Sequence, residues 1–194
     1  MRKLTYFVGM SLDGYIAGPN HDISAFDLSP EFLAWLAAEY PETLPAHVWP
    51  HFGIAPGTAP VHFDTLVMGR NTYEPGQLIG IDSPYPHMTT QYIVSTTLGS
   101  IDAPGVELVD GDPVALVQRL KKEEGKDIWL AGGGQLAAAL LGEIDELIIK
   151  SYPVVLGAGT KALSGTYDPK QFTLTDRKNF ANGTQVSWFT RARR

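Results

Sequence analysis

Residues 127–141, with the sequence DIWLAGGGQLAAALL, constrain the fold more than any other stretch of the chain. An apolar run at residues 128–131 is joined directly to an alanine- and leucine-rich segment by three consecutive glycines. The run has the length of a strand that is buried on both faces, and residues 135–141 have the composition of a helix. The stretch therefore predicts a strand that passes straight into a helix.

The glycine turn at this junction is a candidate site for an anion. The first N–H groups of a helix have no partner within the helix, and the helix dipole favours negative charge there. Glycines also let a ligand approach the main chain and allow positive φ at little cost. The same glycines would equally serve as a tight turn that packs the helix on the sheet, and their spacing is neither GxGxxG nor the Walker phosphate loop. Other segments have to decide between a phosphate site and a structural turn.

Composition narrows the classes of function. The chain has 194 residues, 44% of them hydrophobic, which is enough for one domain with a sizeable core. A net charge of −6 argues against a nucleic-acid or anionic-membrane surface. The absence of cysteine excludes disulfides, thiol catalysis and thiolate metal sites. Because the chain starts without a signal-peptide pattern and has no apolar tract of roughly 20 residues, we expect a cytoplasmic protein without a membrane span.

Strand and helix patterns alternate along the chain. Apolar or alternating runs predict strands at residues 4–10, 65–68, 92–95, 106–109 and 146–155. Ser29 and Pro30 begin a helix over residues 31–39, and Asp112 with Pro113 begins another. Residues 40–63 are rich in proline, histidine and glycine, so an irregular loop or insertion is expected there.

The C-terminal part of the chain has the pattern of a hairpin. Asn182 and Gly183 separate the runs 172–180 and 185–190, which predicts a type I′ turn. Together with the preceding pattern this predicts a three-layer α/β fold over residues 1–194, with a mostly parallel sheet and an antiparallel C-terminal hairpin. The apolar edge with Trp188 and Phe189 further predicts a homodimer, because an uncovered edge strand is a pairing liability.

Five segments then occur in a distinctive order: MSLDGYIAG, LVMGRNTYE, YIVST, IWLAGGGQL and IDELIIKSYPVVLGAG. In this order they resemble the dihydrofolate reductase-like superfamily, most closely the branch formed by the reductase domain of riboflavin-biosynthesis enzymes (RibD C-terminal domain). The similarity extends over nearly the whole chain except about residues 40–61. It implies a dihydrofolate reductase-like fold and NADPH bound along the carboxyl ends of the strands.

The resemblance implies three cofactor-binding segments. The first holds cofactor phosphates and comprises Gly69, Arg70, Asn71 and Thr72; the second borders the adenosine and comprises Ser95 and Thr96; the third comprises Gly132, Gly133, Gly134, Gln135 and Leu136. In dihydrofolate reductases the glycine pair of the third segment is joined by a cis peptide. A guanidinium, an amide and a hydroxyl at a strand-to-helix turn are also the donors that an anion needs. The structural alternatives are a surface salt bridge for Arg70 and a helix cap for Thr72.

The second segment continues differently from its relatives. Thr97 and Leu98 follow where relatives often have an arginine or lysine, so the usual partner of the 2′-phosphate is replaced. We expect NADPH to be preferred, with Arg70 serving the 2′-phosphate, and NADH stays open as an alternative.

Asp13 is the candidate catalytic residue on the substrate side. The resemblance places it in the loop over the nicotinamide, where a carboxyl group could bind substrate or supply a proton; an ordinary Asp-Gly turn is the alternative. In the helix starting at Pro30, Phe32 stands where the resemblance implies the carboxylate that binds a pterin, so dihydrofolate is not expected as substrate. Trp35 and Trp49 could line a pocket for a flat ring or belong to the core. Lys161 could contact a substrate phosphate or be solvated.

No metal site is predicted, because Pro50 interrupts the helix that would align His47 with His51. The sequence thus predicts an NADPH-dependent reductase that passes a hydride to a small heteroaromatic or carbonyl-type substrate. Two alternatives remain: a nucleotide-binding protein without turnover, and the riboflavin-pathway 5-amino-6-(5-phosphoribosylamino)uracil reductase.

Overall fold

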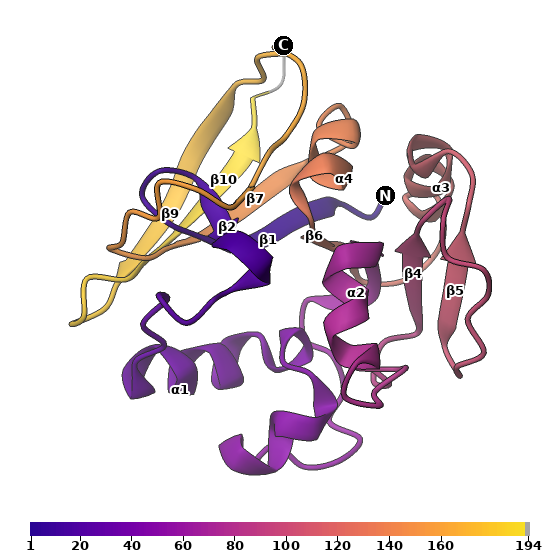
Figure 1. Ribbon diagram of the computed structural model, residues 1–194, viewed down its shortest axis with the longest axis horizontal. Coiled ribbons are helices and arrows are strands. Elements are labelled where there is room, and N and C mark those ends of the chain that lie inside the picture. The colour runs from indigo at the N-terminus through magenta and orange to yellow at the C-terminus, as the bar shows by residue number, and fades with distance from the viewer. Residues whose placement is uncertain (193–194) are drawn as a thin grey trace.

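The computed structural model describes residues 1–192 and is built around an eight-stranded sheet with the order β5-β4-β3-β6-β1-β7-β10-β9 (Figure 1). The strands are β1 (Leu4–Met10), β3 (Phe63–Gly69), β4 (Thr90–Val94), β5 (Val106–Val109), β6 (Asp127–Gly132), β7 (Glu146–Ser151), β9 (Phe172–Asn179) and β10 (Gln185–Arg191). The strands from β5 to β7 are parallel, and β10 and β9 continue the sheet in antiparallel pairs. The carboxyl ends of β1, β3, β4 and β6 therefore meet at one edge.

Helices cover both faces of this sheet. One face packs against α1 (Pro30–Glu39), α2 (Arg70–Gln77) and the 3-10 segments η2 (Pro41–Thr43) and η3 (Ala46–Phe52), through a core that includes Phe7, Phe32 and Tyr73. The other face packs against α3 (Pro113–Leu120) and α4 (Gly134–Ala139), with Val117 and Leu140 in its core. The predicted three-layer α/β fold with an antiparallel C-terminal hairpin is confirmed.

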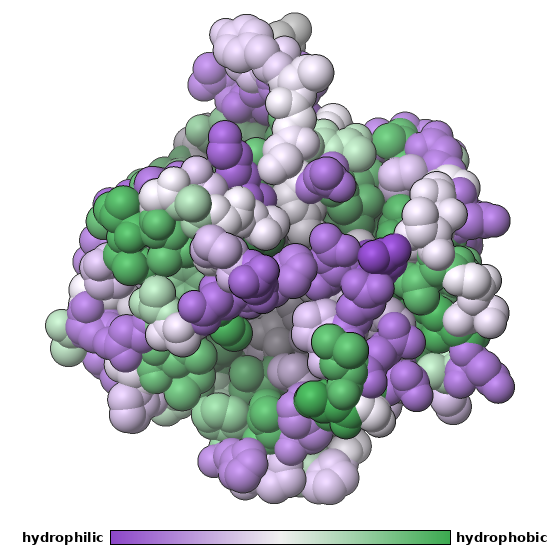
Figure 2. All heavy atoms as spheres, viewed as in Figure 1, coloured by the Kyte–Doolittle hydropathy of each residue, from purple (hydrophilic) through white to green (hydrophobic). Residues whose placement is uncertain are grey.

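Residues 40–63 form the expected irregular segment, and it is packed rather than open. Glu42 is fully buried and its carboxylate accepts the N–H groups of His62 and Phe63 at 2.6 and 3.0 Å. Trp49 is 4% exposed and donates its indole N–H to the carbonyl of Leu44. Trp49 therefore packs in the core, and it also lines an apolar cavity described below. Figure 2 has the same viewing direction as Figure 1. It shows a recess between the sheet and the side of the molecule that carries α1.

Two predicted boundaries are wrong. The strand predicted over residues 146–155 ends at Ser151. Tyr152 donates one more hydrogen bond to the carbonyl of Met10, and Pro153 has no N–H group to continue the ladder. The helix predicted over residues 135–141 runs from Gly134 to Ala139.

The predicted type I′ turn is also wrong. That turn needs positive φ at both central residues, whereas only Gly183 has it, at 87°. The side chain of Asn182 is instead fixed on both sides, because it accepts the N–H of Thr184 and donates to Asp27. The N–H of Gly183 donates to the carbonyl of Phe180 at 2.9 Å, so a turn with a single left-handed glycine closes the hairpin.

Candidate functional site

Two helices begin at the carboxyl edge of the sheet without a side-chain cap. α2 follows β3 through Gly69 and α4 follows β6 through Gly133, whereas Ser29 caps α1 and Asp112 caps α3. The two glycine turns are adjacent, because a Cβ atom built on Gly69 would lie 3.7 Å from the backbone nitrogen of Gly133. Unpaired N–H groups from two helix starts therefore lie close together, which favours an anion.

The three glycines after β6 have three different reasons to be glycine. Gly132 has φ at +116°, a conformation that side chains disfavour. Gly133 has an ordinary φ of −87°, and a Cβ atom on it would meet nothing closer than 3.9 Å, from Ile16 and Thr72. On Gly134 a Cβ atom would lie 2.0 Å from the carbonyl oxygen of Lys161. Of the three, Gly133 alone combines an ordinary φ with room for a Cβ atom in normal van der Waals contact. The implied cis peptide is present between Gly132 and Gly133.

Arg70 lies beside this turn and connects it to the end of β4. Its Nη1 donates to the Thr97 hydroxyl at 2.7 Å, while its Nε pairs with Glu74 at 2.9 Å in the same helix. The Ser95 hydroxyl accepts the N–H groups of Thr97 and Leu98 at 3.2 and 3.0 Å. Arg70 therefore forms the salt bridge of the structural alternative, and the guanidinium still has further N–H donors for a ligand.

The other residues that the resemblance assigns to the cofactor site differ in how exposed their side chains are. Asn71, Thr72, Thr96 and Gln135 are exposed at the edge, so their side chains are accessible to a ligand. Leu136 is 9% exposed and packs in the core beneath α4. Its side chain therefore supports the helix rather than facing a ligand.

Asp13 holds two loops together. Its carboxylate accepts the Ser11 hydroxyl at 2.6 Å and the N–H groups of Leu156 and Gly157 at 3.1 and 2.7 Å. The hydrogen bond from Ser11, followed by those from the backbone, lowers the pKa of Asp13 to about 2. The carboxyl group is therefore ionised at neutral pH. This geometry favours the structural alternative for Asp13 over proton donation.

The loops that Asp13 joins form a flap of residues 11–17 and 156–162. Within it β2 (Tyr15–Ala17) pairs with β8 (Thr160–Lys161), and η1 (Pro19–His21) follows. The Tyr6 hydroxyl donates to the carbonyl of Ala162 at 2.8 Å and anchors the flap to β1. The backbone of Lys161 packs against Gly134 while its side chain is exposed, so the flap lies directly against the glycine turn.

The start of α1 offers no free carboxylate to the sheet. Phe32 is 1% exposed and packs edge-on against Tyr152 and Phe180 at ring distances of 5.8 and 5.3 Å. Glu31 accepts the N–H of Ala181, and Asp27 binds Asn182. Both acids are therefore engaged by the turn of the C-terminal hairpin.

One polar residue on this side was missed by the sequence analysis. Lys150 of β7 is half-buried, and its Nζ lies 4.2 Å from the centre of the Phe7 ring. Burial lowers the pKa of this amine to about 8. The only available signal was a lysine at an inward position, between Ile148 and Tyr152, of an otherwise apolar strand.

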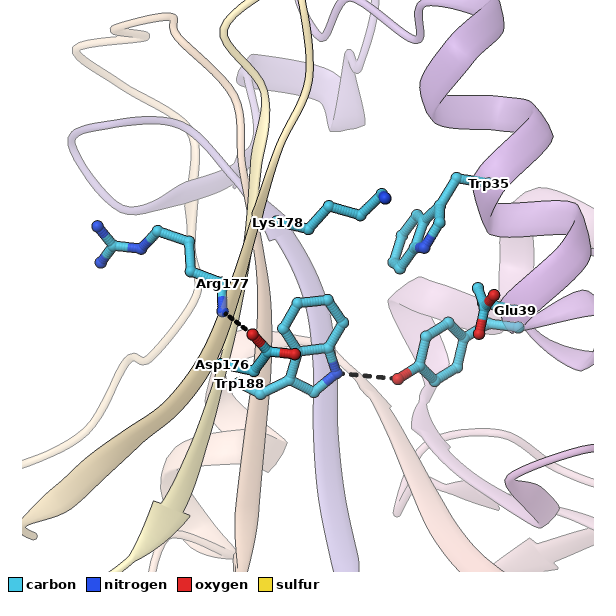
Figure 3. Close-up of a pocket in the computed structure, with 7 residues that line it drawn as sticks. Trp35, Glu39, Asp176, Arg177, Lys178 and Trp188 are labelled. Carbon is cyan, nitrogen blue, oxygen red and sulfur yellow. Dashed lines mark hydrogen bonds between the residues drawn. The ribbon is translucent and has the colours of Figure 1, made fainter.

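Two cavities lie away from the cofactor segments. One of about 440 Å³ separates α1 from β9 and β10; its walls include Trp35 and Trp188, and the Trp188 indole donates to the Tyr40 hydroxyl at 2.9 Å (Figure 3). Figure 3 shows Lys178 reaching across it toward Trp35. The other, about 320 Å³, is apolar and lies between η3 and His87. Neither contains a residue of the implied cofactor site.

The strand order of the sheet and the two glycine turns at its carboxyl edge together define a dihydrofolate reductase-like α/β protein. The chain belongs to the RibD C-terminal domain family, whose model matches residues 62–186. Two uncharacterized proteins of Bacillus subtilis (strain 168) are similar to it: YwjB, 29% identical over 96% of this chain and 97% of its own, and YyaP, 25% identical over 94% and 91%. The resemblance inferred from the sequence motifs is confirmed.

Solved structures support the same fold. A protein of Shewanella sp. PV-4 that has been assigned to riboflavin biosynthesis superposes with a TM-score of 0.70 over 100% of both chains at 22% identity. The diaminohydroxyphosphoribosylaminopyrimidine deaminase/5-amino-6-(5-phosphoribosylamino)uracil reductase of Thermotoga maritima gives 0.63 over 98% of this chain and 57% of its own, at 13% identity. Within residues 1–192, no helix is long and apolar enough to cross a membrane, and no cluster of three His, Asp or Glu residues could hold a metal.

Proposed function

We propose that this protein is an NADPH-dependent reductase that acts on a small heteroaromatic or carbonyl-type substrate between the carboxyl edge of the sheet and α1. The observation that supports it is the pair of adjacent, uncapped helix starts at Gly69 and Gly133. A diphosphate needs several N–H donors and a backbone that it can approach closely. Gly133 supports the second need, because it has no side chain to shield its backbone and no neighbour would lie closer than 3.9 Å to an added Cβ atom.

Each segment of the edge has a part in this proposal. The N–H groups of the two turns and the hydroxyl of Thr72 hold the diphosphate. Arg70 and Thr97, already joined at 2.7 Å, hold the 2′-phosphate, and Ser95 with Thr96 borders the adenosine. When bound, NADPH supplies the hydride. Asp13 keeps the flap closed against Gly134, so that the edge stays in one geometry.

Membership in the RibD C-terminal domain family favours one particular reaction within this class. That reaction is the reduction of 5-amino-6-(5-phosphoribosylamino)uracil, which the name of the Thermotoga protein contains. It is the second candidate, because the phosphate of this substrate requires a cation and the flap carries an exposed lysine, Lys161.

Two measurements test the proposal. Calorimetric titration with NADPH and NADH measures cofactor affinity, and loss of NADPH absorbance with a panel of aminouracil, pteridine, quinone and aldehyde compounds measures turnover. Substrate-dependent oxidation is the expected result. Tight NADPH binding without turnover on any compound supports a nucleotide-binding protein instead. Failure to bind either nucleotide refutes both.

A further inference from the structure

We propose that Lys150 is the proton donor of this site, delivering a proton to the oxygen or nitrogen atom of a polar double bond, C=O or C=N, in the substrate. The inference rests on the proposed reductase function and identifies the class of group that is reduced. It starts from the position of the amine, which lies over the Phe7 ring and, within residues 1–192, has no ion pair or hydrogen bond.

Lys150 lies in surroundings that suit an apolar residue. Its Nζ faces the Phe7 ring at 4.2 Å, and its Cε lies 3.7 Å from the position of a Cβ atom on Gly9. Desolvation is the only influence on its pKa, so within residues 1–192 no carboxylate or hydrogen bond stabilises the charge. Burying an unpaired ammonium destabilises a fold. Perturbed, unpaired charges of this kind cluster at functional sites.

The register of the sheet places Lys150 near the cofactor edge. It pairs with Gly9, one step before the last pair of β1 and β7, formed by Met10 and Ser151. β1 is also the neighbour of β6, which ends in the glycine turn. Phe7, which the amine contacts, belongs to the core cluster that includes Phe32 of α1. The ammonium is therefore on the α1 side of the sheet, one strand from the turn that would hold the diphosphate.

A glycine at position 9 is required for this arrangement. A Cβ atom there would lie 2.9 Å from the Tyr152 ring, so any side chain would displace Tyr152 or Lys150. The ionisable groups on the surrounding elements are Tyr152 directly after β7, Tyr40 after α1, Glu31 and Glu39 on α1, Glu146 on β7, Arg191 on β10, and Asp176, Arg177 and Lys178 on β9. None of them forms a hydrogen bond or ion pair with Nζ. Within residues 1–192, the N–H donors of the amine therefore remain unpaired.

The chemistry follows from this position. The carbon of the C=O or C=N bond accepts a hydride from NADPH, and the π electron pair moves to the oxygen or nitrogen. One N–H bond of the Lys150 ammonium breaks, its electron pair stays on Nζ, and the proton goes to the heteroatom. The substrate is reduced by two electrons, NADP⁺ is left, and the neutral amine regains a proton from water. An acid with a pKa of about 8 is well matched to this step near neutral pH.

Three variants test the inference. Lys150→Met keeps the length of the side chain without its proton, Lys150→Arg keeps the charge on a group too basic to give up a proton, and Lys178→Met is the control at a lysine of β9. Both Lys150 variants should lower kcat/KM about 100- to 10,000-fold, the range of general-acid catalysis. Lys178→Met should leave it unchanged. The parent should lose kcat/KM above pH about 8, as Lys150 deprotonates; both variants should lack this limb.

A second readout does not depend on turnover. Competitive labelling of lysine amines across a pH series, quantified by mass spectrometry, should show Lys150 titrating near pH 8, below the exposed lysines. NADPH affinity, measured by calorimetry, should be unchanged in Lys150→Met. A parent protein that binds no NADPH refutes the proposed function and this inference together. Normal NADPH binding refutes the inference alone if Lys150 titrates with the other lysines, or if Lys150→Met keeps the parental rate and pH profile.

Discussion

Gly133→Ala separates the effect on cofactor binding from the effect on folding. The added methyl group would have no neighbour closer than 3.9 Å, and φ at this residue is −87°, which alanine adopts without strain. The free energy of unfolding should therefore change by about 1 kcal/mol or less. The same methyl group points into the space proposed for the diphosphate. Losing one charge-assisted N–H contact costs about 1.5 to 3 kcal/mol, or about 10- to 100-fold in affinity.

Calorimetry with NADPH measures the affinity, and urea denaturation measures stability. Gly133→Val extends the test with a larger, branched side chain. Gly134→Ala is the matched control, because its methyl group would lie 2.0 Å from the carbonyl oxygen of Lys161. It should lower stability, whereas Gly133→Ala should not. A folded Gly133→Ala protein that binds NADPH with parental affinity would refute the placement of the diphosphate.

Three further predictions concern the cofactor, the substrate and the assembly. Arg70→Ala should weaken NADPH binding about 10- to 100-fold and bring the NADPH affinity close to that of NADH, because the guanidinium is joined to Thr97 at the adenosine end. Equal losses of affinity for both nucleotides would place Arg70 at the diphosphate. No loss would leave Arg70 only its ion pair with Glu74. Dihydrofolate should not be turned over, since Phe32 offers no carboxylate and Glu31 is engaged by the hairpin turn; robust NADPH oxidation with dihydrofolate would contradict this. The apolar edge expected at Trp188 and Phe189 is not an edge, because both residues lie on β10, which β9 covers. Light scattering should still report a homodimer, because β9 is an edge strand exposed along nearly its whole length; a monomer at all concentrations would count against it.

The fold was predictable because its signals are local. Apolar runs located the strands, and the direct passage from residues 128–131 through three glycines into a helix fixed the α/β class. The end of β7 could have been predicted, because Pro153 has no N–H group to continue the ladder. The type of the hairpin turn was predicted wrongly because the prediction used only the residues of the turn. In the structure the Asn182 side chain binds Asp27, which is distant in sequence.

Lys150 escaped the sequence analysis for the same physical reason. A lysine in an apolar strand can lie at a solvated edge, and the sequence does not show that β1 and β10 close on both sides of β7. Only this pairing brings the amine over Phe7 and beside Gly9. Asp13 shows the reverse situation: its motif was visible, but the N–H groups of Leu156 and Gly157 that occupy its carboxylate come from another part of the chain.

Two residues on the α1 side of the sheet, the uncharged Phe32 and the basic Lys150, bear on which substrates can bind. The resemblance to dihydrofolate reductases implies a helix carboxylate that accepts hydrogen bonds from a ring. Here the helix contributes the apolar ring of Phe32, and the strand contributes the unpaired ammonium of Lys150. An ammonium only donates hydrogen bonds, so the complementary group is an acceptor such as a carbonyl oxygen or imine nitrogen. A cationic ring would be repelled by the same charge, so a neutral or anionic acceptor group is the complementary one.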